Sequence, residues 1–538
     1  MKRFLALLIF LVFPYSAEAA NRYVRTDGLN STSCGLTDDT AACATLSYMV
    51  NTSNNKPVSG DTVYVRAGTY TDNSRVALGR GISISGEGSA TTIINTTGTY
   101  ISARTSVPVA DGSNEIAGIK FIGGGILSTG RSNQKIHDCI LQTSSVSIYG
   151  RYGYDDSGGS FSKATCTGGD AAGSSCENDF TLSVPPSSSD WAVNCQIYNN
   201  TITGGKIFPG ALKQSRIHHN TITNSGSSTI GNTAYWINEV EIDHNNLTAG
   251  SATLSIIGIE IWHISNWCKF HDNTSDSWFS LGVNTRGNDP GYDWSYESYN
   301  NIIVGSNGGG VVEAMEAMTL ISDIWIHNNY FSGAAFTRGI AIWTGYCPNG
   351  AGVISNIRID HNVFYNLPAF GVYIMPSCSA DNFHDINIYN NVFDTMATAI
   401  DLDVKGHEVV SNLDIKNNII LNLTTRGIGI SDSVGGGTVT SNISVDYNFY
   451  HNVSTWLWQS PSGQIADGGH NNNLSPGITG SGNRPDPYYR PSSAGSNLVN
   501  AGINVGLLYS GSAPDIGAFE FASSPPAPPA NLRNGKGP

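Results

Sequence analysis

The sequence predicts an all-β protein, a single-stranded parallel β-helix in which short strands coil into a solenoid. A motif of the form apolar-x-apolar-x-x-Asn-x-apolar recurs along most of the chain, and successive copies, aligned on the Asn, lie 20 to 33 residues apart. Such a period indicates a solenoid. Alternating apolar residues, many of them β-branched, indicate half-buried strands, and no repeat has the pattern of an amphipathic helix. Leucine-rich and helical repeats are therefore excluded.

The recurrent asparagines suit a turn that needs left-handed backbone geometry, which Asn tolerates. If they stack at one corner of the coil, their side chains can hydrogen-bond from rung to rung, so we assign them a structural role. They are Asn200, Asn220, Asn245, Asn273, Asn301, Asn329, Asn362, Asn391, Asn418 and Asn448.

Charge excludes one class of partner. The chain has 538 residues, of which 42 are acidic and 28 basic, and its formal net charge is −14. Nucleic-acid recognition needs basic patches, so we expect no nucleic-acid partner.

The first residues, 1–19, have the layout of a secretory signal peptide. Lys2 and Arg3 precede an apolar run from Phe4 to Phe13, and Ala17-Glu18-Ala19 is a small-x-small cleavage site. The apolar run is too short to span a membrane, and no later segment is long enough. We expect cleavage after Ala19, no transmembrane segment, and a protein that is secreted or held at the cell surface.

The segment after the signal peptide carries a family resemblance. Tyr23 to Gly28, together with Gly60 to Tyr70, resembles the opening of many secreted members of the pectate-lyase-like, right-handed parallel β-helix superfamily. The resemblance covers roughly residues 21 to 521. It implies a right-handed coil with an N-terminal cap over 20–60, including a short helix near Thr40 to Val50 that covers the first rung.

The remaining boundaries follow from composition. The β-helix is expected over 61–521, and residues 151–191, which lack apolar periodicity, are expected to protrude from it as an insertion. Asp515 to Glu520 resembles the ending of bacterial β-helix proteins that often carry surface anchors. A Pro-rich tail follows over 522–538.

Nine cysteines agree with export, and their odd number leaves at least one without an intramolecular partner. Cys347 and Cys378 follow equivalent strands of neighbouring rungs, which lie ~4.8 Å apart, so we expect them to form a disulfide. Cys195 and Cys268 occupy an inward position five residues before the repeat Asn and are expected to be buried free thiols. Two further pairs flank the cap turn and a stretch of the insertion: Cys34 with Cys43, and Cys166 with Cys176.

One face of the predicted coil carries the candidate site. Strand side chains alternate inward and outward, and strands of one face stack in register. Aromatic rings in a row outside the coil would stack on sugar rings, whose C–H faces are apolar. Exposed apolar patches usually mark binding sites. The candidates for substrate binding are Trp262, Asn284, Arg286, Trp343, Tyr373 and Lys405, and those for catalysis are Asp401, Asp403, Glu260 and Glu313.

Two carboxylate pairs could serve hydrolysis with inversion, which needs carboxyl groups about 6.5–9.5 Å apart. Asp401 and Asp403 lie two residues apart on one strand, ~7 Å between backbones. Glu260 and Glu313 lie two rungs apart, ~10 Å, if Val312 and Ala314 point inward. In either pair one carboxylic acid would protonate the leaving oxygen and one carboxylate would activate water.

β-Elimination is the activity that the resemblance most implies. It would use a basic side chain, for which Lys405, Arg286, Arg338 and Arg426 are available on this side. The Ca²⁺-site and Arg motifs of pectate lyases are not intact here, and neither is the Asp-Pro-His-Asp motif of alginate epimerases. The acids could instead bind Ca²⁺ or simply face solvent, so no cofactor is certain and Ca²⁺ is a candidate.

These patterns together predict a secreted, monomeric protein that acts on polysaccharide. It would cleave glycosidic bonds in a groove along one face of the β-helix, by hydrolysis or by elimination. The alternative is a surface adhesin or glycan-binding scaffold without enzymatic activity, which agrees with the anchor-like ending.

Overall fold

A computed structural model of the chain describes residues 19–104, 109–150, 188–224, 228–231, 236–249, 257–261, 263–281, 295–305, 313–316, 320–334, 338–343, 353–375, 382–403, 409–431, 438–459 and 466–521. The predicted signal peptide up to residue 18, most of the predicted insertion (151–187) and the Pro-rich tail (522–538) lie outside the described residues. So do Cys166, Cys176, Cys347 and Cys378, and the expected disulfide between the last two stays a prediction.

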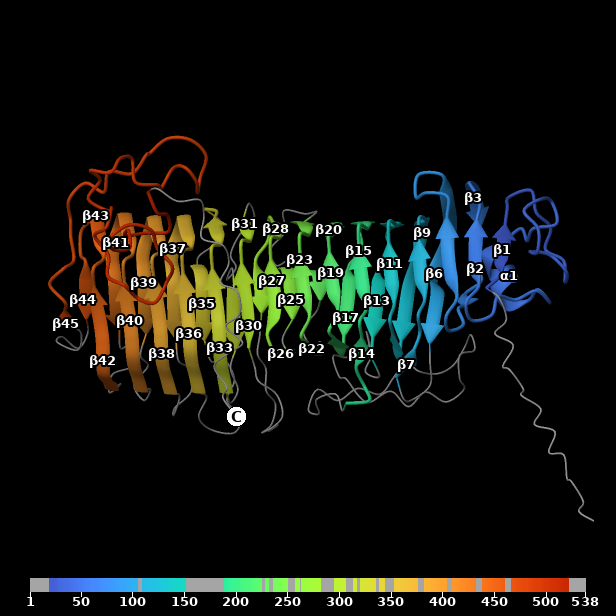
Figure 1. Ribbon diagram of the computed structural model, residues 1–538, viewed down its shortest axis with the longest axis horizontal. Coiled ribbons are helices and arrows are strands. Elements are labelled where there is room, and N and C mark those ends of the chain that lie inside the picture. The colour runs from blue at the N-terminus through green and yellow to red at the C-terminus, as the bar shows by residue number, and fades with distance from the viewer. Residues whose placement is uncertain are drawn as a thin grey trace, which may run out of the picture.

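The chain is a right-handed parallel β-helix, as the sequence predicts. Figure 1 shows its strands side by side along one long axis, in chain order from the blue cap to the orange end. The strands pair in parallel with the equivalent strands of the next repeat, as β19 does with β23 through Ile217 and Ile242. A crossover between parallel strands of one sheet is right-handed in nearly all proteins.

Sheet 1 contains 16 described strands, in the order β1 (Asn21–Val24), β2 (Thr62–Val65), β5 (Ser83–Gly86), β8 (Glu115–Ala117), β11 (Lys135–His137), β15 (Gln196–Tyr198), β19 (Arg216–His218), β23 (Glu241–Asp243), β27 (Cys268–His271), β30 (Tyr296–Tyr299), β33 (Leu320–His327), β36 (Val353–Asp360), β38 (Asn382–Tyr389), β40 (Val409–Lys416), β42 (Thr438–Asp446) and β45 (Ala466–Asp467).

Sheet 2 contains the other strands of each repeat, so that a typical repeat passes one strand of sheet 1 and two of sheet 2. Its strands are β3 (Gly68–Thr71), β4 (Val76–Ala77), β6 (Thr92–Arg104), β9 (Lys120–Thr129), β12 (Ile140–Gln142), β13 (Val146–Tyr149), β16 (Thr201–Thr203), β17 (Ile207–Gly210), β20 (Thr221–Asn224), β21 (Ser228–Gly231), β24 (Asn246–Ala249), β25 (Ile257–Ile261), β28 (Thr274–Ser275), β29 (Phe279–Leu281), β31 (Ile302–Val304), β32 (Glu313–Glu316), β34 (Tyr330–Ser332), β35 (Arg338–Trp343), β37 (Val363–Met375), β39 (Val392–Asp403), β41 (Ile419–Ser431), β43 (Phe449–Val453) and β44 (Leu457–Gln459).

Two small parallel sheets complete the described strands. They are β7 (Ala110–Asp111) with β10 (Arg131–Ser132), and the row β14 (Ala192–Val193), β18 (Leu212–Lys213), β22 (Trp236–Asn238) and β26 (His263–Ser265).

The recurrent asparagines form a buried ladder at the corner between sheet 1 and sheet 2. Asn329 is representative: its Nδ2 donates to Oδ1 of Asn362 at 3.0 Å and to the carbonyl of Ser298 at 2.9 Å. The predicted structural role is therefore confirmed. The left-handed geometry, however, belongs to the residue before each ladder Asn, such as Asn328 with φ 55°. That residue turns the corner, and its successor then points its amide inward.

The interior is filled by stacked aliphatic and aromatic side chains. Ile259, Ile340, Val372 and Ile400 are all at most 1% exposed, which confirms the predicted inward positions. Cys195 and Cys268 are buried free thiols, as predicted, and Cys139 is a third.

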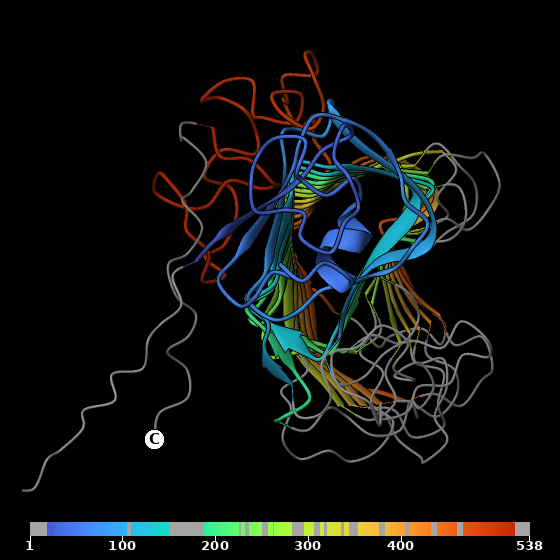
Figure 2. The ribbon, with the colours of Figure 1, turned by 90° about the vertical axis from the view of Figure 1, so that its right-hand side faces the viewer.

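The N-terminal end is closed by the predicted cap. Figure 2 shows α1 (Leu46–Asn51) lying across the open end of the coil. The hydroxyl of Thr45 accepts a hydrogen bond from the backbone N–H of Tyr48, so the helix begins after Thr45, within the predicted range. Cys34 and Cys43 form a disulfide beside it.

The C-terminal end departs from the predicted boundary, because the last described strand ends at Asp467 and not near residue 521. Residues 468–521, drawn in red in Figure 1, fold back beside the outer side of β37 to β43. Tyr489, Leu498 and Ile516 form an outer hydrophobic cluster with side chains of sheet 2 such as Val392. The carboxylate of Asp515 accepts the N–H groups of Asn500 and Phe521, both at 2.7 Å, so the anchor-like ending closes a docked segment.

Among the described residues, no helix is both long enough and apolar enough to cross a membrane.

Candidate functional site

The predicted aspartate pair lies on the late strands of sheet 2. In the register of β35, β37, β39, β41 and β44, one column runs through Ala341, Tyr373, Asp401, Gly429 and Trp458. Asp401 and Asp403 alternate with Ile400 and Leu402, which are 1% exposed in the core. The alternation of a strand therefore places both carboxyl groups outside the coil, as predicted.

Asp401 is outside the coil but not exposed, since only 4% of it is accessible. Its Oδ1 has no hydrogen-bond partner, and the guanidinium of Arg426 lies 3.8 Å from it. Burial raises the pKa of Asp401 to about 6; the nearby charge of Asp403 adds to this, and Arg426 partly opposes it. Asp401 is thus a carboxyl group that keeps its proton to a higher pH than an ordinary aspartate does.

A glycine makes room for this arrangement. A Cβ added at Gly429 would lie 2.5 Å from Oδ1 of Asp401 and 3.0 Å from Cδ and Nε of Arg426. Any side chain here would displace the carboxyl group, the guanidinium or both.

Arginines and aromatic rings flank the pair on both sides. Arg338 lies over the ring of Tyr373 at 4.4 Å, and Phe370 stacks on the same ring at 4.9 Å. On the other side Arg426 lies over the ring of Trp458 at 4.2 Å, and Trp458 is 38% exposed. Burial, followed by the charge of Asp403, raises the pKa of Tyr373 to about 12, so Tyr373 stays neutral and is no base at physiological pH.

Of the predicted row of exposed aromatics, Tyr373 has a described side chain, and it is 7% exposed, because side chains on rungs ~4.8 Å apart cover one another. Trp262, Asn284, Arg286 and Lys405 lie outside the described residues, and Trp343 is described only by its backbone in β35. Trp458 was missed, although Leu457 pairs with Ile428 and so extends the same inward pattern by one rung.

The second predicted carboxylate pair, Glu260 with Glu313, does not form as predicted. Glu260 is 5% exposed on β25, and burial raises its pKa against the opposing influence of Lys206 and Ser228. In the backbone register, however, Glu260 is followed by Ser280 and then Ala314, whereas Glu313 pairs with the core residue Phe279. The predicted alignment of Glu313 is wrong by one residue.

The two candidate centres are also far apart. Five rungs separate β25 from β39, a distance of ~24 Å, so Glu260 cannot cooperate with Asp401.

Ca²⁺, the candidate cofactor, takes about 6–8 oxygen ligands. Among the described residues, no third Asp or Glu joins Asp401 and Asp403 in a group that could hold a metal.

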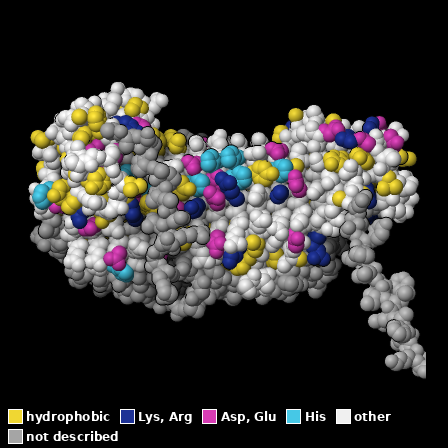
Figure 3. All heavy atoms as spheres, viewed as in Figure 1, with side chains coloured by type: hydrophobic (Ala, Val, Ile, Leu, Met, Phe, Trp, Pro, Cys, Tyr) yellow, Lys and Arg dark blue, Asp and Glu magenta, His cyan; other side chains and the backbone are white. Residues whose placement is uncertain are grey.

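Groups that could hold a metal lie instead on the outer face of sheet 1, which the sequence analysis did not select. Figure 3 shows His side chains gathered in the middle of this face, with charged side chains beside them. In the register, His218 of β19 pairs with Asp243 of β23, which pairs with His271 of β27. The same column continues to Tyr299 and His327 on the next two strands.

The histidines and the aspartate of this column each contact the left-handed corner residue that follows them. Nδ1 of His218 lies 2.9 Å from Nδ1 of His219, and Oδ2 of Asp243 lies 2.6 Å from Nδ1 of His244. A left-handed residue interrupts strand alternation, so two consecutive side chains lie on the same side of the sheet. The signal was present in the sequence as His-His, Asp-His and His-Asp directly before the ladder asparagines.

Comparison with models of protein families finds no match, and comparison with curated proteins finds none either. Solved structures give matches of low similarity. The A-module of a mannuronan C-5 epimerase from Azotobacter vinelandii is 12% identical, with a TM-score of 0.34, over 77% of this chain and 91% of that one. The catalytic unit of a thermostable alpha-1,3-glucanase from Streptomyces thermodiastaticus is 12% identical, with a TM-score of 0.34, over 78% and 64%. A pectate lyase is 13% identical, with a TM-score of 0.29, over 94% and 97%. At this level the similarities say nothing about what this chain binds or cleaves.

Proposed function

We propose that this protein is exported, acts on a polysaccharide, and cleaves glycosidic bonds at Asp401 and Asp403. The observation that carries the proposal is the carboxyl group of Asp401: it is buried, its Oδ1 lacks a hydrogen-bond partner, and its pKa is raised to about 6. A buried polar atom without a partner is rare in native proteins and calls for a functional explanation.

Hydrolysis is the favoured reaction. A carboxylic acid with a pKa near 6 can donate its proton to a leaving glycosidic oxygen, and a second carboxyl group two residues along the strand can activate water. The backbones of Asp401 and Asp403 are ~7 Å apart, within the range for inversion of configuration. Arg426 would then bind a hydroxyl or carboxylate of the sugar beside the reacting bond.

The exposed ring of Trp458 supports a sugar-binding role beside this acid. It lies two rungs from Asp401, ~10 Å along the coil, with Gly429 on the rung between them. A sugar stacked on Trp458 would extend its chain over the carboxyl pair. Because Asp401 is buried, productive binding requires the side chains that cover it to open.

Elimination is less well supported by the described residues. Its base would be a cation, and both described candidates lie over aromatic rings, Arg338 over Tyr373 and Arg426 over Trp458. Both are arginines, which stay protonated at any physiological pH.

The test is incubation of the purified protein with neutral and uronate-containing polysaccharides, followed by reducing ends and by the ultraviolet absorbance of the unsaturated uronate that elimination leaves. Hydrolysis gives reducing ends without absorbance, and Asp401→Asn and Asp403→Asn each abolish them. Absorbance that survives in these variants but is lost in Arg426→Ala would replace hydrolysis by elimination. If the wild type binds but cleaves no polysaccharide, the protein is a surface glycan-binding scaffold.

Localisation and oligomeric state belong to the same proposal. The layout of residues 1–19 supports export with cleavage after Ala19, and the disulfide between Cys34 and Cys43 agrees with an oxidising compartment. We propose that the exported protein is a monomer. N-terminal sequencing of the mature protein and sedimentation would test these two points.

A further inference from the structure

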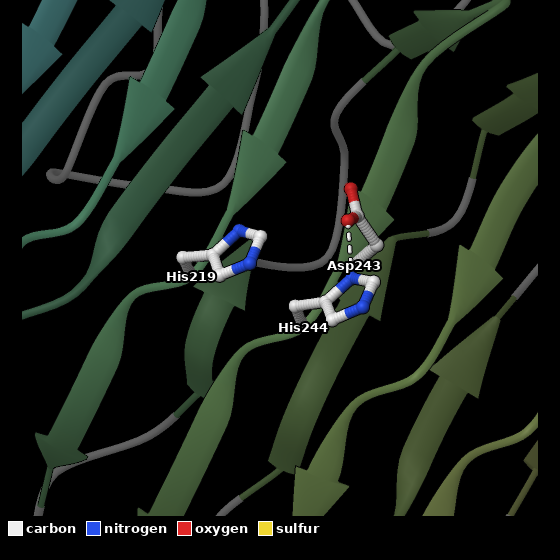
Figure 4. Close-up of side chains that lie close together, drawn as sticks. All are labelled: His219, Asp243 and His244. Atoms are coloured by element: carbon white, nitrogen blue, oxygen red, sulfur yellow. Dashed lines mark hydrogen bonds and ion pairs between the residues drawn. The ribbon is translucent and has the colours of Figure 1, made fainter.

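We propose that His219, Asp243 and His244, on the outer face of sheet 1, bind a divalent transition-metal ion such as Zn²⁺. One ligand atom of each side chain lies within 4.8 Å of the other two. Figure 4 shows the imidazoles of His219 and His244 side by side, with the carboxylate of Asp243 directed at His244. The site is separate from the aspartate pair on sheet 2 and does not depend on the function proposed there.

The backbone conformation determines the positions of the two histidines. His219 and His244 have φ values of 55° and 53°, and each directly precedes a buried ladder asparagine. Successive rungs therefore present the two imidazoles in the same orientation, and their rings stack at 4.7 Å with an interplanar angle of 4°. Two histidines in this corner position on adjacent rungs therefore already lie beside each other, where both could bind one metal ion.

Asp243 is the rigid member of the group. Its side chain is fully buried, and Arg216 holds both oxygens, Nε to Oδ1 at 2.7 Å and a terminal nitrogen to Oδ2 at 2.6 Å. A carboxylate that its neighbours hold in place suits a metal better than a mobile one.

Zinc–ligand bonds of about 2.0–2.2 Å place ligand atoms ~3 Å apart, so the group must contract slightly. His219 and His244 are exposed and can rotate, whereas Asp243 can stay in place. The ion would take the place of the hydrogen bond between Nδ1 of His244 and Oδ2 of Asp243, and the proton on Nδ1 would move by way of solvent to Nε2, so that His244 stays a neutral ligand. Two imidazoles and one carboxylate favour Zn²⁺ over Ca²⁺ or Mg²⁺, which prefer oxygen ligands only.

The chain contains a matched control for this site. Asp360 and His361 repeat the pair, with Nδ1 of His361 2.8 Å from Oδ2 of Asp360, and Nε of Arg358 2.6 Å from Oδ1. The corner residue one rung earlier is Asn328 instead of a histidine. The control therefore keeps the Asp–His contact and an arginine on the carboxylate but lacks the second corner imidazole, and Nε1 of Trp325 also donates to Oδ1 of Asp360.

The experiment is isothermal titration of the full-length, chelator-treated protein with ZnCl₂ at neutral pH and physiological salt, with Co²⁺ absorption as a second readout. We expect saturable binding of one ion per chain, and His219→Ala and His244→Ala should each weaken it at least ~10-fold. His361→Ala should leave the affinity unchanged, and far-UV circular dichroism should show all variants folded.

Three results would overturn the proposal: no saturable binding by the wild type, undiminished binding by His219→Ala, or equal losses in His361→Ala and His244→Ala. Since His219 and His244 are exposed, their removal should leave the fold intact, and His219→Gln gives a second variant of similar size should His219→Ala prove unstable.

Discussion

Replacing Asp401 by Asn should stabilise the protein near neutral pH, because it removes a buried carboxylate while keeping the shape of the side chain. The native pKa of Asp401 is about 6, against an ordinary value of 3.8. At 1.36 kcal/mol per pH unit, this difference corresponds to about 3 kcal/mol.

The sign follows from proton binding. Between pH 3.8 and about 6 the native protein holds a proton on Asp401 that the unfolded chain has released. The free energy of unfolding of the wild type therefore falls as pH rises through this window and stays lower above it. Asn does not titrate, so the gain in stability of Asp401→Asn over wild type should be up to about 3 kcal/mol larger at pH 7 than at pH 3.5.

The assay is urea unfolding of both proteins by circular dichroism at pH 3.5, 5 and 7. Because a solenoid can unfold in segments, hydrogen exchange of the β39 amides should be measured on the same samples. In the difference between the free energies of unfolding of the two proteins at each pH, the contributions of all other titrating groups cancel, provided that the substitution does not affect them.

Asp385→Asn is the matched control of opposite sign. His384, and then Asn412, hold the pKa of Asp385 below its usual value, so its contribution to stability is present at pH 7 and is lost as pH falls. Asp385→Asn should thus lose stability relative to wild type at pH 7, and this loss should shrink as the pH falls below 3.8. If Asp401→Asn instead gains nothing between pH 3.5 and pH 7, Asp401 is not the proton-holding acid and the hydrolytic proposal loses its basis.

Four further substitutions, one of them a control, and one labelling experiment test the same structure. Gly429→Ala should destabilise the protein and displace Asp401, whereas Gly495→Ala, whose nearest contact would be at 3.8 Å, should be neutral in thermal unfolding. Asn329→Ala leaves several buried ladder groups without partners and should cost at least ~2 kcal/mol in urea unfolding; a cost below ~0.5 kcal/mol would contradict the ladder's role. Trp458→Ala should weaken glycan binding in affinity electrophoresis without changing thermal stability much, since the ring is 38% exposed. Cys195 should resist alkylation in the native protein and react fully once it is unfolded, as mass spectrometry would show.

Much of the coil could be predicted because its pattern is local. The alternation of Ile400, Asp401, Leu402 and Asp403 along one strand decides which side chains face the core, and that alternation follows from strand geometry alone. The spacing of the ladder asparagines likewise revealed the rungs, since each repeat must return to the same corner.

Prediction failed where the pattern was short or where the partner lay on another rung. Around β32 the sequence Val311-Val312-Glu313-Ala314-Met315 does not alternate cleanly between apolar and polar residues, so two registers were open, and pairing with β29 decided between them. The repeat was identified by its asparagines. The left-handed geometry and the histidine pairs belong to the residues before them, whose identity varies from rung to rung.

What the sequence determined by itself is the solenoid, its corners, and the side of the strand on which Asp401 and Asp403 lie. Only the tertiary structure decided that Arg426 faces Asp401 across the space above Gly429, and that His219 stacks on His244. The physical reason is that facing in or out depends on the covalent geometry of one strand. The neighbours of a side chain on the next rung depend instead on the inter-strand hydrogen bonds that set the register, and burial, pKa and ligand geometry all follow from those neighbours.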